Sequence, residues 1–191
     1  SKDIVLITFD KQHPNVIAID SNTGREVWKY DPKVEGYDPE TYASREFITY
    51  TWDVEVIDDI NDDDIQDVVI SSWYSVIALE GDDGEEIWIN DDACTHDIWS
   101  IEILDDKIIA GSEAGELVAV NKEDGELEWT SEIKPTTTVL LRSLTTVIER
   151  EIPSAINDII VIGEDILISA DNGFLYTISG DDGTKNDDYE L

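Results

Sequence analysis

The sequence repeats one hairpin pattern four times, and this repeat limits the possible folds more than any other feature. The four copies are VIAIDSNTGREVW (16–28), VIALEGDDGEEIW (76–88), LVAVNKEDGELEW (117–129) and LYTISGDDGTKND (175–187). In each copy, a short and mostly apolar stretch predicts a strand, and a turn then leads into a second strand. Because a short β unit cannot bury its apolar face alone, the repeat predicts units that stack on one another.

Every copy carries glycine at the same place in its turn, where a tight hairpin needs a positive φ. These glycines are Gly24, Gly84, Gly125 and Gly183. In the first three copies a tryptophan follows the glycine by four residues, and these residues are Trp28, Trp88 and Trp129. The last copy has Asp187 at that position. The spacing therefore predicts that all four copies form the same hairpin. In the last copy, the second strand of that hairpin should differ at its end, where the tryptophan is absent.

A second pair of strands precedes each of the later hairpins. TWDVEVID (51–58) matches IWSIEILD (98–105), and residues 156–183 align without gaps to residues 98–125. Tandem units of four short strands, about 40 residues long, are typical of β-propeller blades. The sequence thus predicts an all-β chain with about four blades of four antiparallel strands. We place them at about 1–30, 51–90, 97–130 and 156–191, with insertions at 31–50 and 131–155.

The hairpin pattern aliphatic-x-Ala-aliphatic-x-x-x-x-Gly-x-x-x-Trp resembles the PQQ-like propeller repeat. That family includes quinoprotein dehydrogenases and the lipoprotein of the bacterial outer-membrane assembly machine. The resemblance covers nearly the whole chain outside the two insertions. It implies that Trp28, Trp88 and Trp129 dock between adjacent blades, and that the blade with Asp187 is degenerate or terminal.

The number of blades raises a question about closure. The first copy starts with DIVLITF (3–9) and has no strand of the first type before it, and we expect the last copy to end soon after its third strand. PQQ-like propellers usually close with seven or eight blades, and an open arc leaves strand edges and a blade face uncovered. The chain is therefore a single propeller domain or a fragment, a half-propeller completed by further chains, or a compact four-bladed ring. We favour the first two.

Composition excludes several classes of protein. A formal net charge of −34 disfavours binding to nucleic acid or insertion into an anionic membrane, and it favours cations or basic partners. Cys94 is the only cysteine, so we expect a small core residue and exclude an intrachain disulfide and a CxxC zinc site. No apolar run is long enough to span a bilayer. The chain starts with Ser and lacks Met, so we expect a processed or trimmed product from which a signal or anchor has been removed. The acidity, together with the calcium loop described below, favours an extracellular or cell-surface protein.

The stretch DINDDDIQD has the spacing of a calcium loop, in which alternate residues of a tight turn point oxygen atoms at one hard cation. It resembles the calcium loops of FG-GAP-type propellers and the first part of an EF-hand. The predicted ligands are Asp59, Asn61, Asp63, the backbone carbonyl of Ile65, and Asp67.

Two positions depart from the calcium-loop pattern. Asp64 stands where Gly is usual, although Asp adopts the left-handed conformation at modest cost, and Ile70 replaces the last Glu of an EF-hand. The alternative is a charged hairpin turn without metal. However, the matching turn of the next blade is only DDK (105–107), and extra like charges repel one another unless a cation lies among them. We interpret the loop as a structural calcium site with a Kd of about 0.1 to 1 mM.

Propeller geometry places the calcium loop on the same face as the glycine turns, with both insertions on the opposite face. We expect the insertion at 131–155 to add a hairpin or a short helix. Recognition usually lies in such loops on a rigid scaffold. Candidates for contact with a sugar or peptide are Trp73, Tyr74, Tyr37, Tyr42 and His96, with His13 and Arg45 nearby. Each is also explained without a ligand, as a cover for a blade edge, part of a turn, or a local hydrogen-bond partner.

Catalysis is not expected. Quinoprotein dehydrogenases of the similar family use adjacent cysteines and a cofactor held in a complete ring, so a chain with one Cys and half a ring should not bind PQQ. The sequence has no convincing Ser, His and Asp arrangement for nucleophilic catalysis. Its carboxylates are so numerous that a pair resembling the two acids of a glycosidase would occur by chance and indicates nothing. We expect a non-catalytic, calcium-stabilised propeller for protein interaction or extracellular assembly, with a protein partner or further copies completing the ring. The alternative is a carbohydrate-binding or polysaccharide-enzyme-associated propeller.

Overall fold

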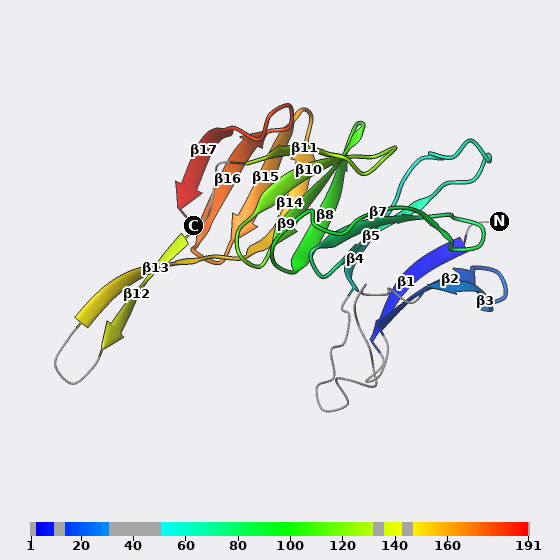
Figure 1. The fold of residues 1–191 in the computed structure, drawn as a ribbon, viewed down its shortest axis with the longest axis horizontal. Coiled ribbons are helices and arrows are strands. Elements are labelled where there is room, and N and C mark those ends of the chain that lie inside the picture. The colour runs from blue at the N-terminus through cyan, green and yellow to red at the C-terminus, as the bar shows by residue number, and fades with distance from the viewer. Residues whose placement is uncertain (1–2, 10–13, 31–50, 132–135, 143–146, 191) are drawn as a thin grey trace.

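The computed structural model describes residues 3–9, 14–30, 51–131, 136–142 and 147–190. All regular secondary structure in these ranges is β-strand, and every strand pairs with its sequence neighbour in an antiparallel ladder. The sheets follow one another along an arc, with the first and last at opposite ends (Figure 1). The described residues thus confirm the all-β, partial-propeller fold predicted from the repeat. Within these ranges, no helix is both long and apolar enough to cross a membrane.

Four sheets correspond to the four repeats, and we call them blades 1 to 4. Blade 1 contains β1 (Asp3–Phe9), β2 (Pro14–Asp20) and β3 (Glu26–Tyr30). Blade 2 contains β4 (Thr51–Val56), β5 (Val68–Ser72), β6 (Ser75–Leu79) and β7 (Glu86–Asn90). Blade 3 contains β8 (Ile98–Leu104), β9 (Lys107–Ser112), β10 (Leu117–Asn121) and β11 (Leu127–Thr130). Blade 4 contains β14 (Ile156–Ile162), β15 (Asp165–Ala170), β16 (Phe174–Ser179) and β17 (Lys185–Glu190).

Blade 4 has a fourth strand, so the prediction that the last copy ends soon after its third strand is wrong. β17 pairs with β16, and Asp187 lies opposite Thr177 in this ladder. Every residue of β17 is exposed. Its sequence, KNDDYE, lacks the aliphatic residues that the other strands contain, because backbone pairing at the sheet edge is sufficient to form this strand.

The insertion at 131–155 contains a separate two-stranded hairpin of β12 (Thr136–Arg142) and β13 (Val147–Pro153). It extends away from blade 4 (Figure 1). Of the two structures expected in this insertion, a hairpin or a short helix, the described residues therefore form the hairpin. The insertion at 31–50 lies outside the described residues.

The core lies between blades, because the two faces of each blade pack against different neighbours. We call the face that points to the next blade in the sequence the forward face, and the other the backward face. In blade 2, Val69 belongs to the cluster shared with blade 3, whereas Val68 and Ile70 belong to the cluster shared with blade 1. In blade 3, Ile108 and Ile109 alternate in the same way between blades 2 and 4. These strands are therefore apolar on both faces, and each blade is stabilised by its neighbours.

Candidate functional site

The loop between β4 and β5 is organised by the carboxylate of Asp59. Its Oδ1 accepts backbone N–H groups of Asn61 at 3.2 Å and Asp63 at 3.1 Å, and its Oδ2 accepts the N–H of Asp64 at 2.7 Å. Desolvation raises the pKa of Asp59, but these N–H donors outweigh it and hold the pKa below its ordinary value. The ionised side chain therefore fixes the loop as a tight turn.

Two aspartates of this loop adopt the left-handed backbone conformation, Asp62 with φ 65° and Asp64 with φ 70°. Asp64 is the position at which calcium loops usually have Gly, and the structure gives it the conformation that a Gly would adopt there. The side chains of Asn61 and Asp63 accept the N–H groups two residues ahead, at 3.2 Å and 2.7 Å. The loop is thus closed by its own side chains.

Asp67 lies at the base of the loop and is fully buried. Its Oδ2 accepts the N–H of Ile60 at 2.9 Å, and its Oδ1 accepts the N–H of Gly81 at 3.1 Å. Burial raises the pKa of Asp67, and the charges of Asp63 and Asp59 raise it further. The two N–H donors lower this pKa, but they do not outweigh the burial. Because both oxygens bond to backbone, Asp67 joins the β4–β5 loop to the β6–β7 turn.

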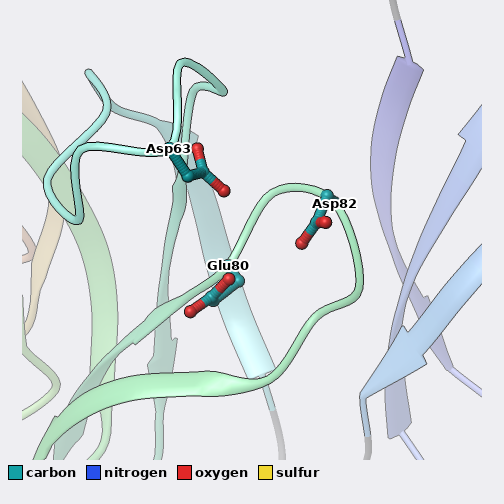
Figure 2. A group of neighbouring side chains, drawn as sticks. All are labelled: Asp63, Glu80 and Asp82. Atoms are coloured by element: carbon teal, nitrogen blue, oxygen red, sulfur yellow. The ribbon is translucent and has the colours of Figure 1, made fainter.

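The joined loops bring Asp63 beside Glu80 and Asp82 of the β6–β7 turn (Figure 2). One carboxylate oxygen from each lies within 4.8 Å of the others, and no other such group of three metal-binding side chains occurs in the described ranges. We call these residues the acidic cluster. The Asn61 side chain forms a hydrogen bond with Glu80. Of the five predicted ligands, only Asp63 belongs to the acidic cluster.

Like charges make the acidic cluster unfavourable without a counter-ion. Desolvation, and then the charges of Asp83, Asp82 and Asp63, raise the pKa of Glu80, although the hydrogen bond with Asn61 opposes this. Carboxylate oxygens are the ligands that hard divalent cations prefer, and calcium takes six to eight of them. The arrangement can therefore hold a metal ion on the face that carries the glycine turns.

Trp73 and Tyr74 occupy the turn between β5 and β6. Their rings lie 5.8 Å apart, and Trp73 has φ 53°, a left-handed conformation that is uncommon for an aromatic residue. The carbonyl of Trp73 accepts the N–H of Ile98 at 2.6 Å, and that of Tyr74 accepts the N–H of Cys94 at 3.1 Å. The turn is thus bonded to the connection between blades 2 and 3, and Tyr74 packs against the core there.

The connection between blades 2 and 3 carries His96, the other described member of the predicted ligand face. Thr95 Oγ1 lies 2.9 Å from His96 Nδ1 and donates to the carboxylate of Glu116 at 2.6 Å. The imidazole lies 3.5 Å from the same carboxylate. Cys94 is buried beside them, as expected, and burial, with a smaller contribution from Glu116, raises its pKa to about 12. The remaining candidates, His13, Tyr37, Tyr42 and Arg45, lie outside the described residues.

Two tryptophans that the sequence analysis did not single out form a pair at the starts of β4 and β8. Trp52 and Trp99 have ring centroids 6.1 Å apart. Each stands at an irregularity in the ladder, where one extra residue interrupts the pairing register. The signal was present in the alignment of residues 51–58 with 98–105, because both tryptophans follow the first residue of the matched segment. A bulge at this point re-aims the side chain.

Each predicted docking tryptophan contacts the following blade. Trp28 Nε1 donates to the carbonyl of Gly81 at 2.9 Å, Trp88 Nε1 to that of Lys122 at 3.2 Å, and Trp129 Nε1 to that of Gly180 at 3.1 Å. The indole faces lie on the turn glycines, so closely that a Cβ would come within 2.5 to 2.6 Å of the ring; these are Gly84, Gly125 and Gly183. The interblade role of the three tryptophans is confirmed.

A second side chain, two residues after each tryptophan, adds another bond to the next blade. Tyr30 Oη donates to the carboxylate of Glu86 at 2.6 Å. Asn90 Nδ2 donates to the carbonyl of Gly125 at 2.8 Å, and Ser131 Oγ to that of Gly183 at 2.7 Å. The end of the last strand in each of blades 1 to 3 is therefore held to the following blade at two points.

Comparison with solved structures shows the same fold. BamB from Moraxella catarrhalis is 14% identical, with a TM-score of 0.58 over 100% of this chain and 51% of that one. BBS1N, in a complex with ARL6DN, is 11% identical, with a TM-score of 0.64 over 99% and 49%. The WD40 propeller domain of Doa1 is 12% identical, with a TM-score of 0.61 over 97% and 52%. The chain thus spans about half the length of these propellers.

The sequence matches none of the curated proteins. A family model described as outer membrane protein assembly factor BamB matches residues 1–147, a stretch that includes the first three hairpin copies and their tryptophans. The match therefore covers more than half of the chain, including the three tryptophans that form the interblade contacts described above. Together with the propeller fold, this shows that the chain belongs to the family of the outer membrane protein assembly factor BamB.

Proposed function

We propose that this chain is a non-catalytic β-propeller that binds another protein chain during assembly, outside the cytoplasm, and that calcium stabilises it. The observation that carries the proposal is the family match over residues 1–147, because that family is described as an outer membrane protein assembly factor. Rigid blades joined through tryptophans suit such a role, since they hold surface loops and end faces in fixed positions.

The chemistry of the described polar side chains supports a non-catalytic role. Cys94 is buried, and a thiol with a pKa near 12 is not ionised at neutral pH, so it is a poor nucleophile. The hydroxyl of Thr95 donates to Glu116 and lies beside His96, an arrangement that fixes a connection between blades. These groups are therefore used in structural bonds.

Calcium is proposed at the acidic cluster of Asp63, Glu80 and Asp82. Three carboxylates supply part of the six to eight oxygen ligands that calcium takes, and water or the predicted oxygens of Asn61 and Ile65 would supply others. Asp59 and Asp67, also predicted as ligands, already accept backbone N–H groups and shape the loop. In this proposal calcium offsets the repulsion between two turns of blade 2.

We predict that 10 mM calcium stabilises the wild-type protein by about 1.4 to 2.7 kcal/mol, as follows from a Kd of about 0.1 to 1 mM. For a chain of this size the midpoint of thermal unfolding should rise by about 3 to 10 °C. Asp63→Ala or Glu80→Gln should abolish most of this shift. Calorimetry in buffers of matched ionic strength is the measurement, because any salt screens a net charge of −34.

The matched control is Asp124→Ala, which removes an exposed carboxylate from the equivalent turn of blade 3. This variant should keep the full calcium shift. Equal shifts in wild type, Asp63→Ala and Glu80→Gln would show that calcium acts elsewhere or only as a screening ion.

Stability should depend on pH in a direction set by the desolvated carboxylates. Burial raises the pKa of four of them in the folded chain, namely Asp53, Glu55, Asp67 and Glu80. A carboxyl group with a raised folded pKa binds protons more tightly in the folded state, so the folded state gains stability as pH falls toward the unfolded pKa of about 4. We therefore predict a higher melting temperature at about pH 5 than at pH 7.5 in calcium-free buffer.

At lower pH the trend should reverse. Hydrogen bonds hold the pKa of Asp59 below its ordinary value despite desolvation, and those of Asp20 and Asp182 are lowered chiefly by Thr23 and Thr184. Their stabilisation is lost as pH falls through the lowered folded values, below about pH 4. Calcium should also stabilise less at pH 5, because protons compete for its ligands. A melting temperature that falls steadily from pH 7.5 to 5 would contradict this account.

The interaction role is tested by cross-linking the chain at its native level in the cells that produce it. Lys29 lies in β3 of blade 1 and Lys185 in β17 of blade 4, and these two blades stand at opposite ends of the arc. We expect cross-links from this chain to a second polypeptide, identified as linked peptides by mass spectrometry. Cross-linked products no larger than a single chain on a denaturing gel would contradict an interaction role.

A further inference from the structure

The forward face of blade 4 is an apolar sheet face without a neighbour among the described residues. Ile57, Leu104 and Ile162 hold equivalent positions in blades 2, 3 and 4. The first two lie under the next blade and are 2% and 5% exposed, whereas Ile162 is 60% exposed. Ile160 and Tyr189 share its face and are 48% and 54% exposed. Blade 4 therefore has the surface that its predecessors use for stacking, but no blade among the described residues covers it.

One row of this face differs from the same row in the other blades. Across the second, third and fourth strands, blade 2 has Val69, Ala78 and Trp88, and blade 3 has Ile109, Ala119 and Trp129. Blade 4 has Leu167, Thr177 and Asp187. Blade 4 retains an apolar residue, Leu167, on its second strand. On its fourth strand the carboxylate of Asp187 stands where blades 2 and 3 have the indole that contacts the turn of the following blade.

The turn of blade 1 differs in the complementary way. Gly24 has φ 66°, and its N–H donates to the carbonyl of Asp20 at 2.7 Å, as Gly84 and Gly125 do in their turns. However, a Cβ on Gly24 would meet no atom within 4 Å, whereas the other turn glycines lie under an indole. The residue after Gly24 is Arg25, which is exposed, and the corresponding residues of the other turns are Glu85, Glu126 and Thr184. This turn alone therefore offers a cation beside its glycine.

The backward face of blade 1 is partly apolar: its β2 residues Ile17 and Ile19 lie opposite Lys29 and Glu26 of β3. Ile17 and Ile19 alternate with Val16 and Ala18, which pack against blade 2, and Val27 is 46% exposed. The end blades also differ in charge: residues 1–30 contain four Lys or Arg and four Asp or Glu, whereas residues 156–190 contain one Lys and nine Asp or Glu. An acidic end is therefore repelled less by a neutral end than by a second acidic end.

We propose that a second copy of this chain closes the ring, with the forward face of blade 4 packed on the backward face of blade 1 of the other copy and Asp187 paired with Arg25. Asp187 cannot donate to a turn carbonyl as an indole does, but it can accept from a guanidinium. The chain covers 51% and 49% of two propellers that it resembles, so two copies together match the length of one such ring. A twofold axis then creates this interface twice. The inference deepens the proposed interaction function and rests on it.

Light scattering at about 0.15 M salt tests the inference, because exposed charges more than about 8 Å apart are then largely screened. Wild type should have twice the 21.5 kDa mass of one chain. Asp187→Arg and Arg25→Glu should each weaken the dimer at least tenfold, since like charges then face each other. An equimolar mixture of these two variants should recover the two-chain mass, because both interfaces again pair opposite charges.

Glu123→Arg is the control, since it makes the same change of charge in the turn of blade 3, away from both end faces, and it should leave the dimer intact. Ile162→Asp changes an exposed side chain of the forward face and should also give single chains. Single wild-type chains at about 0.1 mM would overturn the inference, as would a dimer unaffected by Asp187→Arg and Arg25→Glu. Cross-links to a different protein in cells would then still support the interaction function, so the two failures are distinguishable.

Discussion

Trp88→Ala should lower the free energy of unfolding by about 3 to 5 kcal/mol, the usual cost of removing a large aromatic side chain from a packed site. The indole packs against the cluster between blades 2 and 3, lies on Gly125, and donates to the carbonyl of Lys122 at 3.2 Å. Alanine would remove all three interactions and leave a gap between the blades. Unfolding in urea or guanidinium, followed by circular dichroism, is the measurement.

Two variants identify the source of this cost. Trp52→Ala removes an indole that is 38% exposed, so it should cost about 1 kcal/mol or less. Trp88→Phe retains an aromatic ring and loses the hydrogen bond to Lys122, which is worth about 0.5 to 1.5 kcal/mol. A cost below about 1 kcal/mol for Trp88→Ala would mean that the indole does not join the blades.

Gly125→Ala should be the second most damaging change, at about 2 to 5 kcal/mol. Gly125 has φ 72°, and alanine in the left-handed region costs about 1 to 2 kcal/mol. The new Cβ would also lie 2.5 Å from Cε3 of Trp88, so the indole must move, and overpacking of this kind costs about 1 to 3 kcal/mol. The same denaturation measurement applies.

The control for this prediction is Gly163→Ala in the β14–β15 turn. Gly163 has φ 66°, and a Cβ there meets no atom within 4 Å, so only the backbone cost of about 1 to 2 kcal/mol should remain. The difference between the two variants measures the contact with Trp88. Equal costs at Gly125 and Gly163 would show that the indole gives way without loss.

The sequence was sufficient to predict the features that are repeated. Gly84, Gly125 and the tryptophans that follow them recur at fixed spacing because the same interblade contact recurs, and such periodicity is visible without a structure. Asp64 was recognised as a residue able to replace Gly in the left-handed conformation, and it has φ 70°. In these cases a local backbone or packing requirement leaves a direct mark on the residue type.

Features that depend on contacts between distant segments were predicted less well. β17 has no apolar alternation, because an exposed edge strand needs only backbone bonds, and the strand was missed. Glu80 and Asp82 were not predicted as neighbours of Asp63, because they lie in another turn of the chain. The signal that could have found them was the expectation that both turns lie on the same face of the propeller. The bonds from Ile60 and Gly81 to Asp67, which bring the turns together, leave no periodic pattern.

The most direct test of the account is a double-mutant cycle between Trp88 and Gly125, because the account depends on each indole resting on the turn glycine of the following blade. Once Trp88→Ala has removed the ring, Gly125→Ala should cost only its backbone strain, about 1 to 2 kcal/mol. The measured coupling should then be at least about 1 kcal/mol. Costs that add to within about 0.5 kcal/mol would show that the two residues act independently and would contradict the account.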